Sequence, residues 1–327
     1  MPSFIAGTGA YVPPAVLDND ECARLARVTP EWIVRRTGII ERRVALPDVG
    51  TAAMAVRAGA HALERSGVAV DDVELIIVAT STPDHLTPPT GCEVQAELGA
   101  HRAAAFDVEA GFAAWIYALI LADSALRVGL AGIALVIGAD KLSSITDRTD
   151  PETGPLFGDG AGAVVLSSAG GTAAFASSSW WADGRLAGAL MRRGGGARLP
   201  FDESVLVQRS HLLRMEGTRL FKHAVRTMAG QAANALERAA IGLEEVGLIV
   251  PHQANLRILQ TFARLVDVSW DRVFVNIDRY GNTGAATIPL ALHEAAELGV
   301  TRDGRPTLLV GFGAGATAGA VVLAPTH

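Results

Sequence analysis

The sequence predicts an α/β protein that consists of two copies of one structural unit. Short apolar runs, of the length expected for buried strands, alternate with segments whose apolar residues recur with a helical period. Pieces of the first half also recur in the second half, in the same order. The three pairs are DDVELIIVATSTPD (71–84) with EEVGLIVPHQAN (244–255), AFDVEAGFAA (105–114) with FVNIDRYGNTGAA (274–286), and GDGAGAVVLSS (158–168) with GATAGAVVLAP (315–325). Three matches in one order indicate an internal duplication.

Each pair predicts the same element in both halves. The first pair predicts an acidic lead-in, a buried strand and a polar loop. The second predicts a strand that runs into a helix start rich in small residues. The third predicts a turn of small residues before a strand with the sequence AVVL. We therefore divide the chain into an N-terminal half, 1–170, and a C-terminal half, 171–327. An insertion at about 180–215, which contains MRRGGGARLPFDES, has no counterpart, and we expect it to shape a pocket or its rim.

Composition narrows the class of protein. Of the 327 residues, 50% are apolar and 19% are charged, as in a compact globular protein. The net charge of −6, without a basic cluster, argues against nucleic-acid binding. The N-terminus lacks the features of a signal peptide and no apolar run is long enough to cross a bilayer, so we expect a cytoplasmic protein that does not enter a membrane. Cys22 and Cys92 lack metal-ligand spacing and are expected to be small buried side chains.

Two polar residues of the second half are candidates for catalysis. His252 directly follows the apolar strand 248–250 in VPHQANLR, and a histidine buried at a strand end needs a partner or a role. Asn282 lies in the glycine-bracketed turn of RYGNTGAATIP, where it can cap the following helix. A neutral amide beside a histidine can also hold a carbonyl or enolate oxygen without titrating. We expect both residues to meet Phe112 of the first half near the pseudo-twofold axis of the duplication.

Phe112 raises a question, because it lies where a predicted strand runs into a predicted helix. Enzymes often place a nucleophile at such a junction, since the free N–H groups of the helix stabilise negative charge. The glycine-rich GFGAGATAG (311–319) is not a phosphate loop, since no Lys-Ser/Thr follows it. We expect it to bring backbone N–H donors close to an oxyanion, whereas GDGAGA (158–163) reads as a tight structural turn. The sequence contains no metal-ligand cluster, nucleophile elbow or dinucleotide-binding fingerprint.

Six motifs, taken together, identify a family. They are EWIVRRTGI (31–39), LFGDGAGAVVL (156–166), MEGTRLFKHAV (215–225), VPHQANLRI (250–258), DRYGNTGAATIP (278–289) and VGFGAGATAGAVV (310–322). With them the chain resembles the β-ketoacyl-acyl-carrier-protein synthases III, of the thiolase superfamily, over essentially its whole length. The resemblance implies a thiolase-like, duplicated five-layer αβαβα fold, a homodimer, and a tunnel for a thioester-linked phosphopantetheine arm. It implies an acyl-carrier-protein or coenzyme A thioester as substrate, and no tightly bound cofactor or metal.

The resemblance also implies roles for individual residues. His252 and Asn282 fall on the family's catalytic His and Asn, and Ala314 falls where a backbone N–H helps to form the oxyanion hole. Around the tunnel, the resemblance implies that Trp32, Arg36 and Phe221 bind coenzyme A or the substrate. It implies that Arg257 docks the carrier protein. It also implies that the loop around Thr87 and Pro88 closes the acyl pocket of a neighbouring subunit.

The sequence departs from the family pattern at the nucleophile. The catalytic cysteine of the family belongs at position 112, and phenylalanine cannot form an acyl-enzyme. The neighbouring residues that also differ from the pattern are Gly111, Ala114 and Trp115. Cys92 does not replace the nucleophile, because it aligns with a buried position in a helix. Asp-Pro-Glu-Thr at 150–153 stands where the family has Asp-Arg-Gly/Ser-Thr, which weakens the expected binding of the coenzyme A nucleotide.

Three functions are compatible with this pattern. The first is direct acyl transfer from a thioester to an alcohol or amine acceptor in specialised metabolism, with His252 as the base and with Asn282 and the Ala314 N–H on the oxyanion. The second is decarboxylation of malonyl thioesters, or their condensation without a cysteine. The third is a catalytically silent subunit of a cysteine-bearing synthase. Glu109 either stabilises the helix N-terminus, or has a catalytic role, as a second acid/base or as the residue that orients His252.

Overall fold

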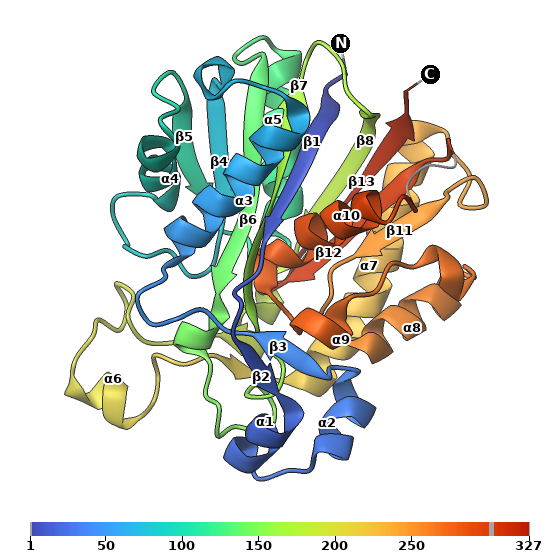
Figure 1. Ribbon diagram of the computed structural model, residues 1–327. Helices are drawn as coiled ribbons and strands as arrows, with labels where there is room; N and C mark the ends of the chain where they lie inside the picture. Colours follow the sequence, from blue (N-terminus) through green and yellow to red (C-terminus); the bar gives the residue numbers. More distant parts are fainter. Residues whose placement is uncertain (1, 301–303, 327) are drawn as a thin grey trace.

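A computed structural model describes residues 2–300 and 304–326 of the chain, and a nine-stranded mixed sheet runs through it (Figure 1). The strand order is β11-β12-β13-β8-β1-β7-β6-β4-β5. Their bounds are β1 Phe4–Tyr11, β4 Leu75–Ala79, β5 Ala104–Val108, β6 Ile133–Lys141, β7 Asp159–Ser167, β8 Ala173–Ala182, β11 Leu248–Pro251, β12 Thr307–Gly313 and β13 Thr317–Pro325. Two small sheets join β2 (Val16–Asp18) to β3 (Glu41–Arg43) and β9 (Leu190–Met191) to β10 (Arg214–Met215).

The sheet order repeats itself on either side of the β1–β8 pair. On one side β7 is antiparallel to β1 and β6, and β4 is parallel to β6. On the other side β13 is antiparallel to β8 and β12, and β11 is parallel to β12. The strands of two of the three repeated sequence pairs, β4 with β11 and β7 with β13, thus occupy matching places. The division of the chain near residue 170 remains a prediction with which this order agrees.

The third pair does not form matching strands. The first half has the edge strand β5, but 274–286 forms the short helix α9 (Ile277–Tyr280) and a 3-10 turn (Gly284–Ala286). A single parallel bridge joins Ile249 to Val273 at the place of the missing strand. The amide of Gln253 replaces the ladder, because its Nε2 donates to the Phe274 carbonyl (3.1 Å) and its Oε1 accepts from the Asn276 N–H (3.1 Å). The expectation of a strand in this segment is therefore wrong.

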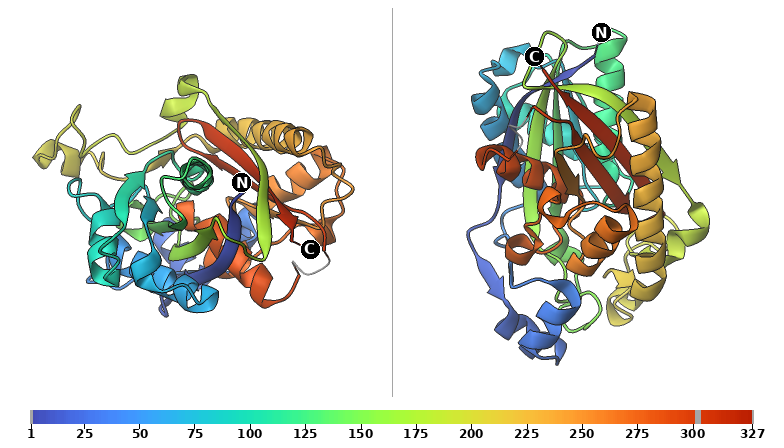
Figure 2. Two further views of the ribbon diagram at one scale, coloured as in Figure 1. Left: turned by 90° about the horizontal axis from the view of Figure 1, so that it is seen from above. Right: turned by 90° about the vertical axis from the view of Figure 1, so that its right-hand side faces the viewer.

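Helices cover the outer sides of the sheet, and two further helices lie between its two halves. The bounds of the longer ones are α1 Asn19–Ala26, α2 Pro30–Thr37, α3 Thr51–Ser66, α4 Thr90–Leu98, α5 Ala114–Arg127, α7 Gly217–Ala239, α8 Leu256–Leu265 and α10 Thr287–Glu297. Outer helix α3 packs on β1, β6 and β7, and outer helix α7 packs on β8, β12 and β13 on the opposite flank (Figure 2). Between them α5 and α10 are almost wholly buried. This is the five-layer arrangement that the resemblance implies.

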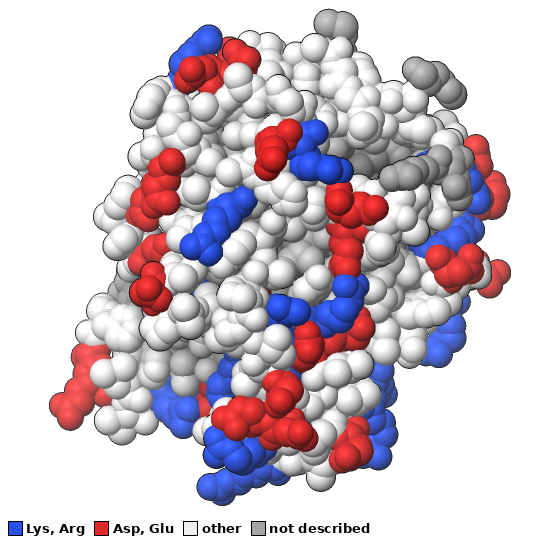
Figure 3. Space-filling model, in the orientation of Figure 1, with Lys and Arg blue, Asp and Glu red and all other residues white. Residues whose placement is uncertain are grey.

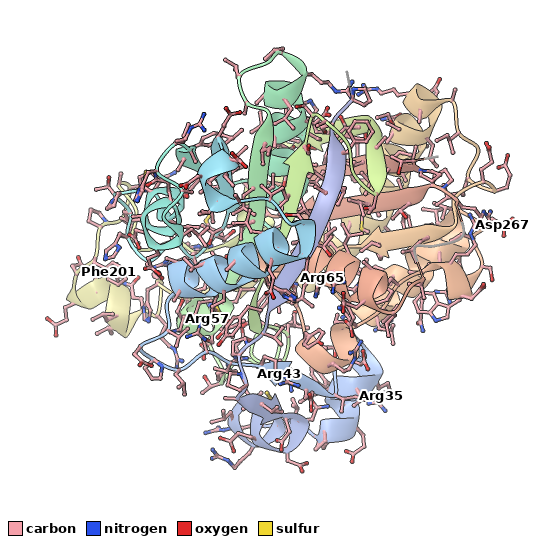
Figure 4. All side chains as sticks on the ribbon, turned by 45° about the horizontal axis from the view of Figure 1, so that its top comes forward. Arg35, Arg43, Arg57, Arg65, Phe201 and Asp267 are labelled. Atoms are coloured by element: carbon pink, nitrogen blue, oxygen red, sulfur yellow. The ribbon has the colours of Figure 1, made fainter. Side chains whose placement is uncertain are left out.

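The predicted insertion begins later than expected. Residues 180–182 belong to core strand β8, so the added segment starts after Ala182 and runs to β10. It carries the one-turn helix α6 (Glu203–Val207), which projects from the body of the molecule (Figure 1). Phe201, whose side chain is 56% exposed, lies on this projecting lobe (Figure 4).

The described residues agree with the main compositional expectations. None of their helices is both long and apolar enough to span a bilayer. Acidic and basic side chains alternate on the face shown in Figure 3, and they gather over the lobe of α1 and α2 without forming a patch of one sign. Cys22 is buried as expected, but Cys92 is exposed on α4. The expectation that Cys92 is buried is wrong for the single chain, although its Sγ lies 3.8 Å from the carbonyl oxygen of Ala105 on β5.

Candidate active site

Four chain segments converge on one cavity of about 320 Å³. His252 follows β11, Asn282 lies in the turn before α10, Phe112 lies between β5 and α5, and Gly313 ends β12. Buried side chains line the inner end, namely Phe112, Leu156, Phe157, Leu190, Leu220, Ala224, Met228, His252, Asn282 and Phe312. The sequence thus correctly predicted that His252, Asn282 and Phe112 meet.

His252 is held inside the protein by two hydrogen bonds. Its backbone N–H donates to the Val310 carbonyl (2.8 Å), and its Nδ1 lies 2.6 Å from the hydroxyl oxygen of Thr287. The ring is 2% exposed, and burial lowers the pKa of His252 to about 3. The imidazole is therefore neutral at physiological pH, as a general base has to be.

We predict that this burial makes the protein less stable as the pH falls from about 6.5 towards 3. The unfolded chain binds a proton on the ring below its ordinary pKa of 6.5, whereas the pKa of the folded ring is about 3. Each pH unit in this window therefore lowers the free energy of unfolding by up to about 1.4 kcal/mol. Urea unfolding of the wild type and of His252→Gln at several pH values measures this contribution as the difference between the two slopes. Equal slopes would contradict the burial of a neutral ring.

Asn282 is oriented by its own turn. Its Oδ1 accepts from the Gly284 N–H (2.9 Å), so Nδ2 is left as a donor; it makes no hydrogen bond within the part of the chain that the structure describes. The backbone N–H of Asn282 donates to the Leu156 carbonyl (2.9 Å), which fixes the turn beside the cavity. The amide can therefore donate a hydrogen bond to an oxygen in the cavity.

Buried Asp140, at the end of β6, supports the same turn from behind. Its carboxylate accepts from the Ala285 N–H (2.8 Å), the Ser81 N–H (2.8 Å) and the Thr82 hydroxyl (2.8 Å). Burial outweighs these hydrogen bonds and raises the pKa of Asp140 to about 6. Gly284 allows this contact, because a Cβ there would lie 2.1 Å from Asp140 Oδ2.

Phe112 fills the position that the resemblance assigns to the nucleophile. Its ring centroid lies 5.7 Å from that of His252 and 5.8 Å from that of Phe157. The Phe112 turn also touches the loop after β12. A Cβ on Gly111, whose φ is +55°, would lie 2.5 Å from the nitrogen of Ala314, and a Cβ on Gly313 would lie 2.3 Å from the nitrogen of Phe112. Only glycines permit this backbone approach.

The residues at the outer end of the cavity are mostly charged or aromatic. Of the binding residues implied by the resemblance, Trp32, Arg36, Phe221 and Arg257 all line the cavity. The Arg36 guanidinium lies 4.9 Å from the centre of the Trp32 ring. Exposed Glu152 lies at the same end. Its carboxylate forms no ion pair with a residue in 2–300 or 304–326.

Four predicted site residues do not line the cavity. Ala314 lies directly behind it, next to the lining residue Gly313, and Thr87 and Pro88 lie outside it. Glu109 is exposed, and its carboxylate accepts from the Gly111 N–H (3.0 Å) and the Ser81 hydroxyl (3.3 Å). The hypothesis that Glu109 orients His252 is therefore wrong, because Thr287 is the hydrogen-bond partner of that ring. These contacts fit the interpretation that Glu109 stabilises the start of the helix, and its role as a second acid/base stays a prediction.

Two residues that support the site were missed in the sequence. Thr287 lies inside the recognised motif DRYGNTGAATIP, but nothing in the sequence alone gives it a role. Asp140 ends the apolar run IALVIGAD, and an acid at the end of a buried strand was the available signal. Both roles depend on partners that are distant in the sequence. Thr287 contacts His252, 35 residues away, and Asp140 contacts Ala285, 145 residues away.

A duplicated five-layer fold with a buried His–Asn pair inside a narrow cavity defines a ketosynthase-like member of the thiolase superfamily. Residues 106–184 match the 3-oxoacyl-[acyl-carrier-protein] synthase III family, and residues 236–324 match the C-terminal family of the same enzymes. The chain is 43% identical to the β-ketoacyl-[acyl-carrier-protein] synthase III of Roseiflexus castenholzii over 98% of this chain and 97% of that protein. The chain belongs to the 3-oxoacyl-[acyl-carrier-protein] synthase III family.

Solved structures agree with this assignment. The β-ketoacyl-[acyl-carrier-protein] synthase III of Thermus thermophilus is 43% identical, with a TM-score of 0.92 over 99% of both chains. The priming β-ketosynthase from the R1128 polyketide biosynthetic pathway is 34% identical, with a TM-score of 0.92 over 99% of this chain and 96% of that one.

Proposed function

We propose that the protein is an acyltransferase that moves an acyl group from a thioester directly to an alcohol or amine acceptor. The proposal is supported above all by the composition of the cavity: its described lining residues include neither cysteine nor serine, whereas His252 and Asn282 are both present. Such a site retains a base and an oxyanion donor, but its described lining has no cysteine or serine to form an acyl-enzyme beside them.

The reaction is a single addition and elimination at the thioester carbon. His252 Nε2 takes the proton of the acceptor while its oxygen or nitrogen attacks the carbonyl carbon. Asn282 Nδ2 and the N–H of Ala314 donate to the oxyanion of the tetrahedral intermediate. The C–S bond then breaks, and the proton passes from His252 to the thiolate, so that an ester or amide and a free thiol leave. Donor and acceptor have to be bound together.

The donor in this proposal is a thioester on an acyl carrier protein rather than free coenzyme A. Arg36, Lys222 and Arg257 give the outer end of the cavity three cations that suit an acidic protein. Glu152 adds an unpaired carboxylate at the same end, which repels the phosphates of a free nucleotide. The apolar inner lining suits an aliphatic or aromatic acceptor or acyl group, and no tightly bound cofactor takes part.

The proposal includes a homodimer formed at the β5 edge of the sheet. Among the described strands, β5 pairs with β4 alone, and Phe106 on it is 38% exposed. Leu86, in the loop that carries Thr87 and Pro88, is 86% exposed. A second copy at this edge would cover both apolar side chains and bring its loop to the cavity of the first, as the family resemblance implies.

The test is release of free thiol from acyl and malonyl thioesters, each carried on coenzyme A and on a carrier protein, with and without apolar primary alcohols and amines. We predict that release requires an acceptor, is faster with the carrier protein, and falls about 10²- to 10⁴-fold in His252→Ala. Mass spectrometry should show the ester or amide. His101→Ala, a change of an exposed histidine outside the cavity, is the matched control and should keep wild-type activity.

Two outcomes would contradict the proposal. Carbon dioxide released from malonyl thioesters without an acceptor would establish a decarboxylase that uses the same His252 and Asn282. A folded wild-type protein that turns over none of the pairs would favour a silent subunit, and co-purification with a cysteine-bearing synthase would then be examined.

A further inference from the structure

The hydroxyl of Thr287 lies between two groups deep in the protein. Its oxygen is 2.6 Å from Nδ1 of His252 and 3.0 Å from the carbonyl oxygen of Gly284, to which it can donate. All three residues are buried, so water does not compete for these contacts. The hydroxyl carries one proton, and the direction of that proton decides which nitrogen of His252 is protonated.

Only one of the two directions satisfies both contacts. If the hydroxyl donates to Gly284, its lone pairs face His252, and Nδ1–H donates to them; two hydrogen bonds form. If the hydroxyl donates to an unprotonated Nδ1, it leaves its lone pairs facing the lone pairs of the Gly284 carbonyl at 3.0 Å. A buried arrangement with one hydrogen bond fewer and two opposed oxygens is the less stable one.

We infer that Thr287 is a positioning residue that holds His252 with its proton on Nδ1, so that the lone pair of Nε2 faces the cavity. Nε2 is then a proton acceptor. This suits removal of a proton from an acceptor nucleophile, whereas stabilisation of an enolate after decarboxylation needs Nε2–H as a donor. The catalytic consequence rests on the proposed function, but the tautomer itself does not.

The other groups near this ring do not oppose the assignment. Phe112 faces the ring from the turn before α5, and Asn282 faces the cavity from the turn before α10. Asp140, the titratable group that packs against the same turn from β6, directs its carboxylate to Ala285, Ser81, Thr80 and Thr82. The hydrogen-bond partner of Nδ1 is therefore the hydroxyl of Thr287 alone among the described residues.

Nitrogen-15 NMR of histidine-labelled protein tests the tautomer without substrate. The chain has eight histidines, and the signal that is lost in His252→Gln identifies the ring. We expect a protonated Nδ1 and an unprotonated Nε2 in the wild type at neutral pH, the same in Thr287→Ser, and a shift of the proton towards Nε2 in Thr287→Val. Protonated Nε2 in the wild type, or an unchanged tautomer in Thr287→Val, would overturn the inference.

Enzyme kinetics provides a second test of the role of Thr287. In Thr287→Val, kcat for acyl transfer should fall about tenfold or more with KM nearly unchanged, and Thr287→Ser should restore it. An unchanged kcat in Thr287→Val would show that Thr287 does not act through His252. If the wild type transfers no acyl group, the proposed function fails while the NMR result still decides the tautomer. If Thr287→Val does not fold, the wild-type and Thr287→Ser spectra decide it.

Discussion

We expect the Phe112→Cys variant to be acylated stoichiometrically by thioesters. A thiol at this position lies at the start of α5, whose N-terminus favours the thiolate, and beside His252, whose neutral ring can accept the thiol proton as it attacks. The backbone nitrogen of Ala314, which we propose as an oxyanion donor, lies close to the same turn, because a Cβ on Gly111 would come within 2.5 Å of it. Intact-mass measurement after incubation with acyl thioesters should show one acyl group per chain in the variant and none in the wild type.

Phe112→Ala is the matched control for this experiment, because it opens the same space without a thiol. Both substitutions should lower the free energy of unfolding, by up to the about 3–5 kcal/mol typical of Phe→Ala in a core, since the ring is only 6% exposed. A folded cysteine variant that iodoacetamide alkylates at position 112, as peptide mapping would show, but that no thioester acylates would show that position 112 does not lie at the reacting carbon.

Gly313→Ala is expected to separate the two backbone segments that surround the proposed oxyanion. The new Cβ would lie 2.3 Å from the nitrogen of Phe112 and 2.7 Å from that of Ala113, so one backbone segment has to move. We expect a loss of about 3 kcal/mol in the free energy of unfolding and about a 10²- to 10³-fold loss in the rate of acyl transfer. Urea unfolding and the thiol-release assay measure the two effects.

Gly230→Ala serves as the control for the same chemical change. Gly230 lies inside α7 with nothing within 4 Å of its Cβ position, so the alanine should stabilise the protein by about 0.5–1 kcal/mol through helix propensity. If Gly313→Ala were as stable and as active as this control, close approach of the Phe112 turn to the loop after β12 would not be needed.

The parts of the fold that repeat in the sequence were predictable, because a duplicated unit leaves its pattern of apolar residues twice. This holds for β4 with β11 and for β7 with β13. It failed at 274–286, where the side chain of Gln253 takes over the hydrogen bonds of a strand. Periodicity describes burial, and it does not report which polar side chain replaces a ladder.

The site was predictable where a motif and a strand end coincide, as at His252 and Asn282. Thr287 and Asp140 could not be placed, because their partners come from distant segments and only the folded chain brings them together. Glu109 shows the opposite error. It lies three residues before Phe112 in the sequence, but its carboxylate turns back to Gly111 and stays outside the cavity.

No described strand pairs with the outer side of β5, and this affects how copies of this chain can associate. At the opposite border of the sheet, Phe274 donates its N–H to Ile249 (2.9 Å), so part of β11 is already occupied by an irregular segment of its own chain. Within the described residues, the nine-stranded sheet therefore offers one open border instead of two. Two copies that pair through the β5 border cover that border on each other and leave none open for a third copy. The absence of one repeated strand therefore favours a dimer over an open-ended fibre.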